Sequence, residues 1–194
     1  NLAATTDAAN GLINLGTLAV DGTIALATNG SGNATVVNDA GLNFAASTVR
    51  GNLTATATTG NMTDSGALTI AGTSSFTTSA NNADITLNAT TNAFTGAITL
   101  STTGSSAHAN IDGGTTALNI GASSVGGNLY LTTGNNITDS GTLTVGGRLR
   151  ATTDANNGAI NLGTLAVDGT VQLTTNGSGN ATVVNDAGLN FAAL

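Results

Sequence analysis

One stretch of eighteen residues, NGSGNATVVNDAGLNFAA, occurs twice in this chain without a change. The first copy covers residues 29–46 and the second covers 176–193, near the other end of the chain. A catalytic site does not require such a duplication, whereas a structure built by stacking similar units does. The repetition therefore predicts a repeat architecture, in which each unit buries its apolar side chains against its neighbours.

A shorter period lies inside this long one. The segment GALTIAG at 66–72 aligns with GTLTVGG at 141–147, and ASTVRGNL at 46–53 aligns with ASSVGGNL at 122–129. The two offsets are nearly equal and indicate that a unit of about 74 residues is repeated within one domain that covers the whole chain. The expected superrepeats are 1–74, 75–147 and the partial copy 148–194, in a domain of residues 1–194.

Each superrepeat divides into subunits with three short apolar runs between turn-forming residues. In NLYLTTGNNITDSGTLTVGG, residues 128–147, these runs contain Leu129, Ile137 and Leu143. Apolar residues that alternate with polar ones between Gly, Asn, Asp and Ser are typical of β-strands. The expected subunits are 1–22, 23–51, 52–74, 75–96, 97–127, 128–147, 148–169 and 170–194, in which two short subunits alternate with a long one.

These patterns predict an all-β fold: a right-handed parallel β-helix, or solenoid, of about eight rungs with three short strands per rung. Each strand is expected to pair with the equivalent strand one rung above and one rung below it, about 4.8 Å away. Equivalent apolar residues should then stack in a single inward-facing column. That column is expected to contain Leu2, Ile24, Leu53, Phe76, Ile98, Leu129, Leu149 and Val171.

The charge pattern excludes several classes of function. The chain has no Lys or Glu, and its three Arg and ten Asp give a net charge of −7, so it lacks the basic surface of a nucleic-acid-binding protein. No apolar run reaches the length of about 20 residues that a membrane-spanning helix requires. The chain also has no Cys for a disulfide or a thiolate site. We therefore expect no nucleic-acid partner, no membrane insertion and no cofactor, in a chain that represents part of a longer protein.

The segment RLRATTDANNGAINLGTLAVDG, residues 148–169, resembles the repeat region of filamentous haemagglutinin-like adhesins in the pattern xLxATTxxGxI followed by GTLxVxG. These adhesins are large secreted exoproteins of Gram-negative bacteria, and many are exported by two-partner secretion. The resemblance extends over essentially the whole chain. It implies a right-handed β-helical filament at the cell surface or released from it, which attaches to host cells, other bacteria or surfaces through an unidentified receptor or glycan.

The acidic residues and the one histidine are the first candidates for chemistry. Nine of the ten Asp precede small turn-forming residues, where an Asp side chain accepts hydrogen bonds within its own turn. A calcium site between stacked turns, with Asp7 near equivalent carboxylates, is the alternative, although the GGxGxDxUx pattern of calcium-binding repeats is missing. His108 is expected on a loop or on the surface, because a zinc site needs further ligands. The sequence therefore predicts no metal site.

One outward-facing group differs from the Thr, Asn and Ala of the other strands. Arg148 and Arg150 alternate along one strand, Tyr130 is expected one rung earlier and Gln172 one rung later. The guanidinium of Arg150 is expected to lie close enough to stack on the ring of Tyr130. These four residues form the candidate binding patch, where an aromatic ring beside cationic and polar groups is suited to a sugar. A solvated face with one cross-strand pair is the alternative.

The function expected from these observations is a structural and adhesive segment of a large secreted filament at the Gram-negative cell surface, and not an enzyme. An ice-binding β-helix is one alternative, but outward pairs such as Ala25 with Ala27 and Thr99 with Ser101 differ too much for a regular lattice. A polysaccharide-processing β-helix enzyme is a second alternative, for which a fold alone is no support. Unpaired strand edges at both ends of the stack also predict end-to-end self-association.

Overall fold

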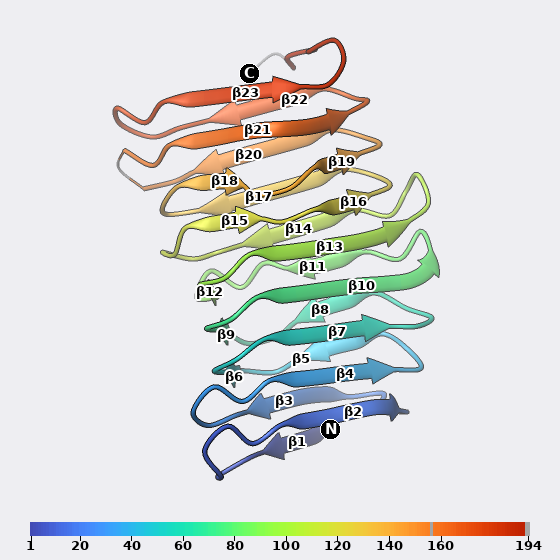
Figure 1. The fold of residues 1–194 in the computed structure, drawn as a ribbon. Helices are drawn as coiled ribbons and strands as arrows, with labels where there is room; N and C mark the ends of the chain where they lie inside the picture. Colours follow the sequence, from blue (N-terminus) through green and yellow to red (C-terminus); the bar gives the residue numbers. More distant parts are fainter. Residues whose placement is uncertain (156, 193–194) are drawn as a thin grey trace.

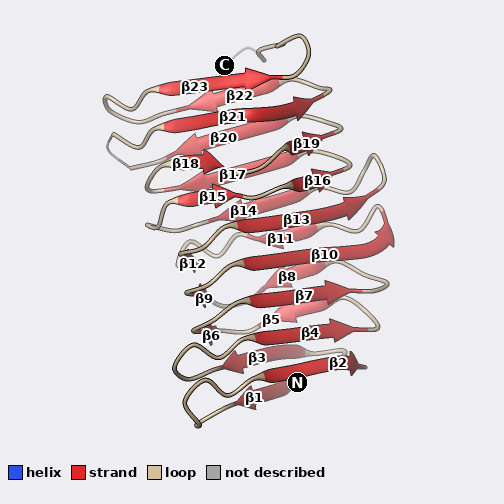
Figure 2. Cartoon of the chain, in the orientation of Figure 1, coloured by secondary structure: helices blue, strands red, loops and turns tan. Residues whose placement is uncertain are grey.

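The computed structural model describes residues 1–155 and 157–192, and every helix or strand within them is a β-strand (Figures 1 and 2). Two parallel sheets face each other, and the chain alternates between them as it rises from the N-terminus to the C-terminus (Figure 1). The prediction of an all-β, right-handed parallel β-helix is therefore confirmed.

The two sheets, named sheet A and sheet B here, share the strands of the described residues almost equally. Sheet A has 12 strands: β1 (Leu2–Thr5), β3 (Thr23–Ala27), β5 (Leu42–Phe44), β6 (Ser47–Val49), β8 (Met62–Asp64), β9 (Leu68–Ile70), β11 (Ile85–Leu87), β12 (Ala93–Phe94), β14 (Ala109–Asp112), β17 (Leu129–Thr133), β20 (Leu149–Thr153) and β22 (Val171–Thr174). Sheet B has 11 strands: β2 (Ile13–Leu18), β4 (Ala34–Asn38), β7 (Leu53–Ala57), β10 (Ser74–Asn81), β13 (Ile98–Thr103), β15 (Leu118–Ile120), β16 (Ser123–Val125), β18 (Ile137–Asp139), β19 (Leu143–Val145), β21 (Ile160–Val167) and β23 (Ala181–Asn185).

The described strands form about 9 turns, close to the expected eight. The central turns, from β5 to β19, each contain three strands as predicted, whereas the turns at both ends contain one longer strand in each sheet. At a spacing of about 4.8 Å per turn, the stack is roughly 40 Å long.

At two of the places where a strand is split in two, a buried serine keeps the pairing intact. The hydroxyl of Ser47, at the start of β6, accepts the backbone N–H of Leu26 at 3.0 Å and donates to the carbonyl of Ala45. The hydroxyl of Ser123, at the start of β16, accepts the N–H of Leu100 at 3.0 Å in the same manner. A buried N–H left without a partner costs about 1–3 kcal/mol, so these serines compensate for the irregular backbone.

The turn length is nearly uniform, which corrects the expected alternation of short and long subunits. Ala34 pairs with Leu53 in the next turn, and Ile85 pairs with Ala109, so each of these turns has about the length of an expected short subunit. The expected long subunit 23–51 contains β3, β4, β5 and β6, which make one and a half turns and not one expanded turn. The superrepeat therefore spans three and a half turns, and the duplicated stretch returns after seven.

A half-integral number of turns places successive copies of one sequence on opposite sheets. Strand β9, with the sequence LTI, belongs to sheet A, whereas its copy β19, with the sequence LTV, belongs to sheet B. The expected single inward column is wrong for the same reason. Of its members, Leu2, Ile24, Leu129, Leu149 and Val171 lie in sheet A, and Leu53, Phe76 and Ile98 lie in sheet B.

The core lies between the two sheets and is apolar along the stack. Phe44, Phe76 and Phe94 are among its largest fully buried side chains. The rings of Phe76 and Phe94 meet edge to face, with their centroids 6.1 Å apart and their planes at 77°. Burial of one such side chain stabilises the fold by about 1.5–3 kcal/mol, so the stability is distributed over all turns.

Buried threonines close corners at the ends of strands in both sheets. The hydroxyls of Thr28, Thr78, Thr102 and Thr153 each donate to a backbone carbonyl four or five residues later, at 2.8–3.2 Å. Because a buried hydroxyl requires a partner, this bond fixes the path of the turn that follows. Thr78, Thr102 and Thr153 each belong to a Thr-Thr pair of the sequence, so each of these pairs supplies one residue that caps a corner.

Side chains at the start of the sheet A strands link each turn to the next. The side chains of Asn61, Asp84, His108 and Asn128 each accept the backbone N–H of the next member of the series, at 2.7–2.9 Å, and Arg148 donates the last of these bonds. This ladder satisfies backbone donors that would otherwise be left unpaired at the edge of the strands. It also holds the central turns of sheet A in register.

Candidate functional site

The predicted patch lies on the outer face of sheet A. Tyr130 of β17 pairs in register with Arg150 of β20, and Arg150 pairs with Gln172 of β22. This confirms that the three residues are neighbours in successive turns. Arg148 immediately precedes β20, and its backbone N–H donates to the side chain of Asn128 at 2.8 Å.

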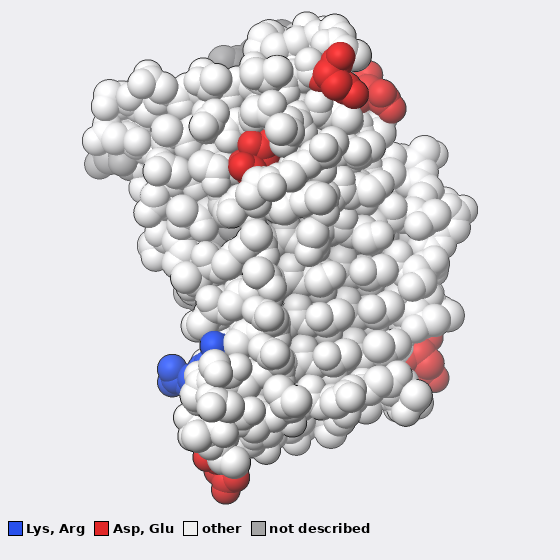
Figure 3. Space-filling model, viewed as in Figure 1, with Lys and Arg blue, Asp and Glu red and all other residues white. Residues whose placement is uncertain are grey.

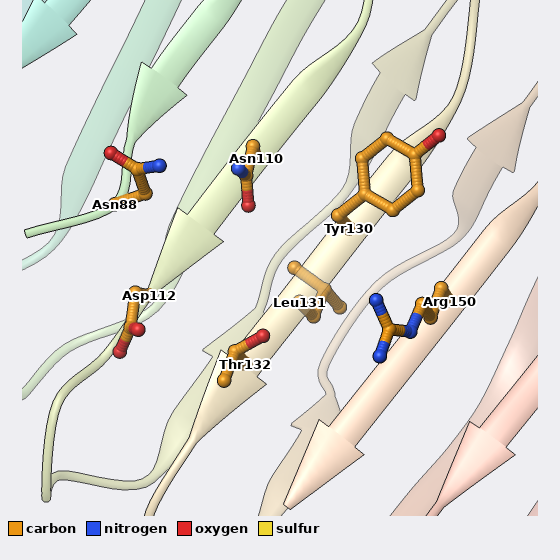
Figure 4. Close-up of a pocket in the computed structure, with 7 residues that line it drawn as sticks. All are labelled: Asn88, Asn110, Asp112, Tyr130, Leu131, Thr132 and Arg150. Atoms are coloured by element: carbon orange, nitrogen blue, oxygen red, sulfur yellow. The ribbon is translucent and has the colours of Figure 1, made fainter. Parts of the chain in front are cut away.

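Tyr130 and Arg150 do not stack on one another as expected. Figure 4 shows the ring of Tyr130 face on when sheet A is viewed from outside. The side-chain amide of Asn128 donates to the Tyr130 hydroxyl at 3.2 Å and so fixes the ring along the strand. The guanidinium of Arg150 extends instead toward β17, on the side of Thr132 (Figure 4). One face of the Tyr130 ring is therefore presented outward.

A hollow of about 410 Å³ opens beside this ring and extends over four neighbouring turns. It is lined by Asn88, Asn110, Asp112, Tyr130, Leu131, Thr132 and Arg150 (Figure 4). Two rows of paired residues cross it, one from Asn110 through Tyr130 to Arg150 and one from Asp112 to Thr132. The structure thus brings Tyr130 and Arg150 together in one site and leaves Arg148 and Gln172 beside it.

Asp112 places a carboxylate at the end of β14, on the opposite side of the hollow from Arg150 (Figure 4). One carboxylate oxygen accepts the backbone N–H of Gly114 at 2.7 Å. Burial raises the pKa of Asp112 above its usual 3.8, the bond from Gly114 opposes that rise, and the charges of Asp154 and Asp64 add to it. Arg150 and Asp112 lie apart on opposite sides of the hollow, so their charges face different parts of it (Figure 4).

Three buried polar atoms around Arg150 have no hydrogen-bond partner in the described part of the chain: Nε of Arg148, Oγ1 of Thr152 and Oε1 of Gln172. Thr152 follows Arg150 by two residues on β20, and Gln172 is the partner of Arg150 in the next turn. Most buried polar atoms in proteins have a partner. This part of sheet A therefore differs from the ladder at its strand starts, where the polar groups are satisfied between turns.

Sequence reasoning missed Asn88, Asn110 and Asp112 as parts of this site. The signal that identifies them is the turn length. Asn110 pairs with Tyr130, and Tyr130 pairs with Arg150 at the same separation along the chain. The expected long subunit 97–127 conceals this separation, because it places Asn110 in an expanded turn and not on a strand that pairs with the strand of Tyr130.

The aspartates bond mainly between turns. Asp64 accepts the backbone N–H of Ala89 at 3.2 Å, and Asp139 accepts that of Thr164 at 2.7 Å, each from the following turn. The expectation that an Asp caps its own turn is confirmed for Asp112 but is wrong for Asp64 and Asp139. These two carboxylates therefore link adjacent turns and do not cap their own turn.

No group of three or more His, Cys, Asp or Glu in residues 1–155 and 157–192 is arranged to hold a metal ion. The calcium alternative at Asp7 therefore gains no support from these residues. His108 is half-buried and is a member of the ladder, since its Nδ1 accepts the backbone N–H of Asn128 at 2.9 Å. His108 lies in the loop just before β14, as the sequence predicts, and its ring makes a specific bond there.

The face of sheet B is broad and carries few charged side chains (Figure 3). Its outward residues are mainly Thr and Ser, for example Thr54, Ser75 and Thr99, which pair with one another in successive turns. Among the residues that the structure describes, none belongs to a helix capable of spanning a membrane.

Comparison with known proteins identifies the repeats themselves. Residues 31–101 and 106–162, about two thirds of the chain, match a family described as repeats of unknown function, DUF5649. No curated protein and no solved structure matches the chain. The matched segments cover most of the described turns, including β14, β17 and β20, which build the hollow. The chain therefore belongs to the DUF5649 family of repeats.

Proposed function

We propose that this chain is a structural and adhesive segment of a large secreted filament at the bacterial surface. The observation that carries the proposal is the continuous parallel pairing of strands through all the described turns, in both sheets. Each turn presents to the next the same strand edges that it receives from the one before, so the geometry allows a stack to grow by adding turns. A rod built in this way gains about 4.8 Å with each turn.

The inward-facing and outward-facing residues of the rod have different roles. Inward apolar residues and the ladders between turns maintain the stack, whereas outward side chains vary without a cost to the core. This separation suits a filament that displays binding groups along its length. The hollow on sheet A, with Tyr130 and Arg150, is the surface that we assign to attachment, to a host or bacterial receptor or to a glycan.

Electron microscopy and an adhesion assay test the proposal together. The protein that contains these repeats should form thin rods, and beads coated with the folded chain should adhere to host or bacterial cells more strongly than beads coated with an unrelated protein of equal charge. Globular particles together with background adhesion would refute it. A rod that does not adhere would retain the structural role and remove the adhesive one.

A specific observation on sheet B favours ice binding as a second candidate function. Three successive turns place pairs of hydroxyls in register: Thr54 with Thr56, Ser75 with Thr77, and Thr99 with Ser101. The sequence predicts an irregular outward array because it compares residues of different sheets. Ala25 and Ala27 lie on sheet A, whereas the three hydroxyl pairs lie on sheet B.

Ice recrystallisation assays with the chain at high concentration test this candidate. Inhibition should be lost in Thr77→Lys, which introduces a charge in the middle of the hydroxyl array, and retained in Thr63→Lys on the opposite sheet. Ice crystals that grow unaffected by the unmodified chain would eliminate ice binding.

We also propose that the isolated chain associates end to end. Both ends of the stack expose large apolar side chains: Leu12 is 68% exposed at one end, and Val184 and Phe191 are 57% and 58% exposed at the other. Light scattering with size-exclusion chromatography should show oligomers that Val184→Lys weakens and Thr99→Lys, on the side of the rod, leaves unchanged. A monomer at all concentrations would contradict this prediction.

A further inference from the structure

The dimensions of the hollow on sheet A fit a short piece of a polysaccharide. Its volume of about 410 Å³ lies within the range of roughly 300–1,000 Å³ that is usual for small-ligand sites. Strands β14 and β20, on its two sides, are separated by two turns, or about 10 Å. This length is comparable to that of a disaccharide, and the surface site leaves room for the chain to continue on both sides.

Tyr130 provides a rigid platform for a sugar ring. The amide of Asn128 holds the phenol in place, and the ring lies with one face outward (Figure 4). A tyrosine fixed in this way offers a large contact area at low cost in conformational entropy. The C–H face of a pyranose packs on such a ring, and its hydroxyls remain directed toward the polar lining.

The charged groups of the hollow distinguish its two ends. Arg150 presents a guanidinium, which binds a carboxylate through two parallel hydrogen bonds. At the other end, Asp112 uses one bond to Gly114 and retains capacity to accept a sugar hydroxyl, but it repels a second anion. The amides of Asn88 and Asn110, between and beside these charges, both donate and accept hydrogen bonds.

We infer that this hollow binds an acidic sugar within a polysaccharide, with the sugar carboxylate on Arg150, the pyranose on Tyr130 and hydroxyl groups on Asp112 and Asn110. A neutral sugar leaves the guanidinium without an anionic partner. A densely charged polyanion is opposed by Asp112 and by the net charge of −7. A ligand that places one carboxylate on Arg150 therefore fits the charges of the site. This inference rests on the proposed adhesive function and names the class of ligand for it.

Calorimetric titration with a trimer of galacturonate, and with its fully methyl-esterified form, tests the inference. The two probes share the same rings and differ in charge. The unmodified chain should bind the acidic trimer at least about tenfold more tightly than the ester, as expected for one charge-assisted interaction. Arg150→Gln should abolish this preference, whereas Arg50→Gln, which removes an equal charge from an exposed residue on another turn, should retain it.

Further measurements test the ring contact, the stability of the fold and the location of binding separately. Tyr130→Ala should weaken binding of both probes, because the ring contact does not depend on charge. Thermal unfolding of Arg150→Gln should match that of the unmodified chain, since Arg150 is exposed. Amide signals of Asn110 and Thr132 should shift on titration with the acidic trimer.

Three results would overturn the inference: equal affinity for acid and ester, a preference that survives in Arg150→Gln, or no binding of either probe at millimolar concentration. Binding of a sulfated trimer without binding of the carboxylated one would also overturn it. These outcomes leave the filament proposal intact, because rods and cell adhesion are measured separately. Loss of adhesion with retained trimer binding would instead remove the adhesive role alone.

Discussion

Asn38 and Asn185 occupy the same place in the two identical copies of the eighteen-residue stretch, and their substitution tests how much a turn depends on its neighbours. The side chain of Asn38 is fully buried, accepts the N–H of Val20 at 2.9 Å, and donates to the carbonyls of Val20 at 3.0 Å and Gly41 at 2.6 Å. Each of these bonds contributes about 0.5–1.5 kcal/mol net. Asn38→Ala should therefore destabilise the fold by about 3 kcal/mol.

Asn185 is the matched control, because only its surroundings differ. It makes the equivalent bonds to Val167 and Gly188, but its two donor bonds are longer, 3.3 and 3.1 Å, and it is half-buried in the last turn that the structure describes. Water can replace partners that lie near the surface, so Asn185→Ala should cost only about 1 kcal/mol.

Urea unfolding followed by circular dichroism measures both changes, and amide exchange at Val20 and Val167 locates them. Val20 should lose protection in Asn38→Ala while Val167 keeps it. Equal destabilisation by the two substitutions would refute the reasoning, since it would show that burial by the adjacent turn does not strengthen these bonds.

Three further predictions address the core, the hollow and the ladder. Phe76→Ala should cost about 3–5 kcal/mol in urea unfolding, because the side chain is fully buried, whereas the 58% exposed Phe191→Ala should cost less than about 1 kcal/mol; similar values would contradict the assigned core. The pKa of Asp112 is raised by burial in the folded state, so its stabilising contribution is present below its usual 3.8 and is lost as the pH rises through the raised value. Asp112→Asn should accordingly melt at a higher temperature than the unmodified chain at pH 7 and at the same temperature at pH 3, and no advantage at pH 7 would disprove this. His108→Asn keeps an acceptor for the N–H of Asn128 and should be nearly neutral, whereas His108→Leu should cost about 1–2 kcal/mol; equal effects would exclude the ladder bond.

Local sequence patterns were sufficient to predict the class of fold. Alternating residues such as Leu129 and Leu131 between Gly and Asn define a strand whatever lies beside it, because the side chains of a strand alternate between its faces. The repetition of these strands required stacking, since one turn cannot bury its own apolar residues. The neighbours Tyr130 and Arg150 were predictable for the same reason, as one simple turn separates them.

The assignment of strands to sheets was not predictable from these patterns. Strands β9 and β19 have nearly the same sequence and lie in opposite sheets, so the sequence of a strand does not specify the sheet to which it belongs. The sheet depends on how many half turns the intervening residues make, and that number is set by corner bonds such as that of Thr102 and by pairing with residues of the adjacent turn.

The sequence by itself therefore determined that the chain is a parallel β-helix, which residues point inward and which strand carries Arg150. The tertiary structure alone decided that the superrepeat spans three and a half turns, and hence that Asn110 and Asp112 share a hollow with Arg150. The physical reason is that alternation along a strand is a local property of the backbone. The register between turns depends instead on hydrogen bonds between residues distant in sequence, which no local pattern records.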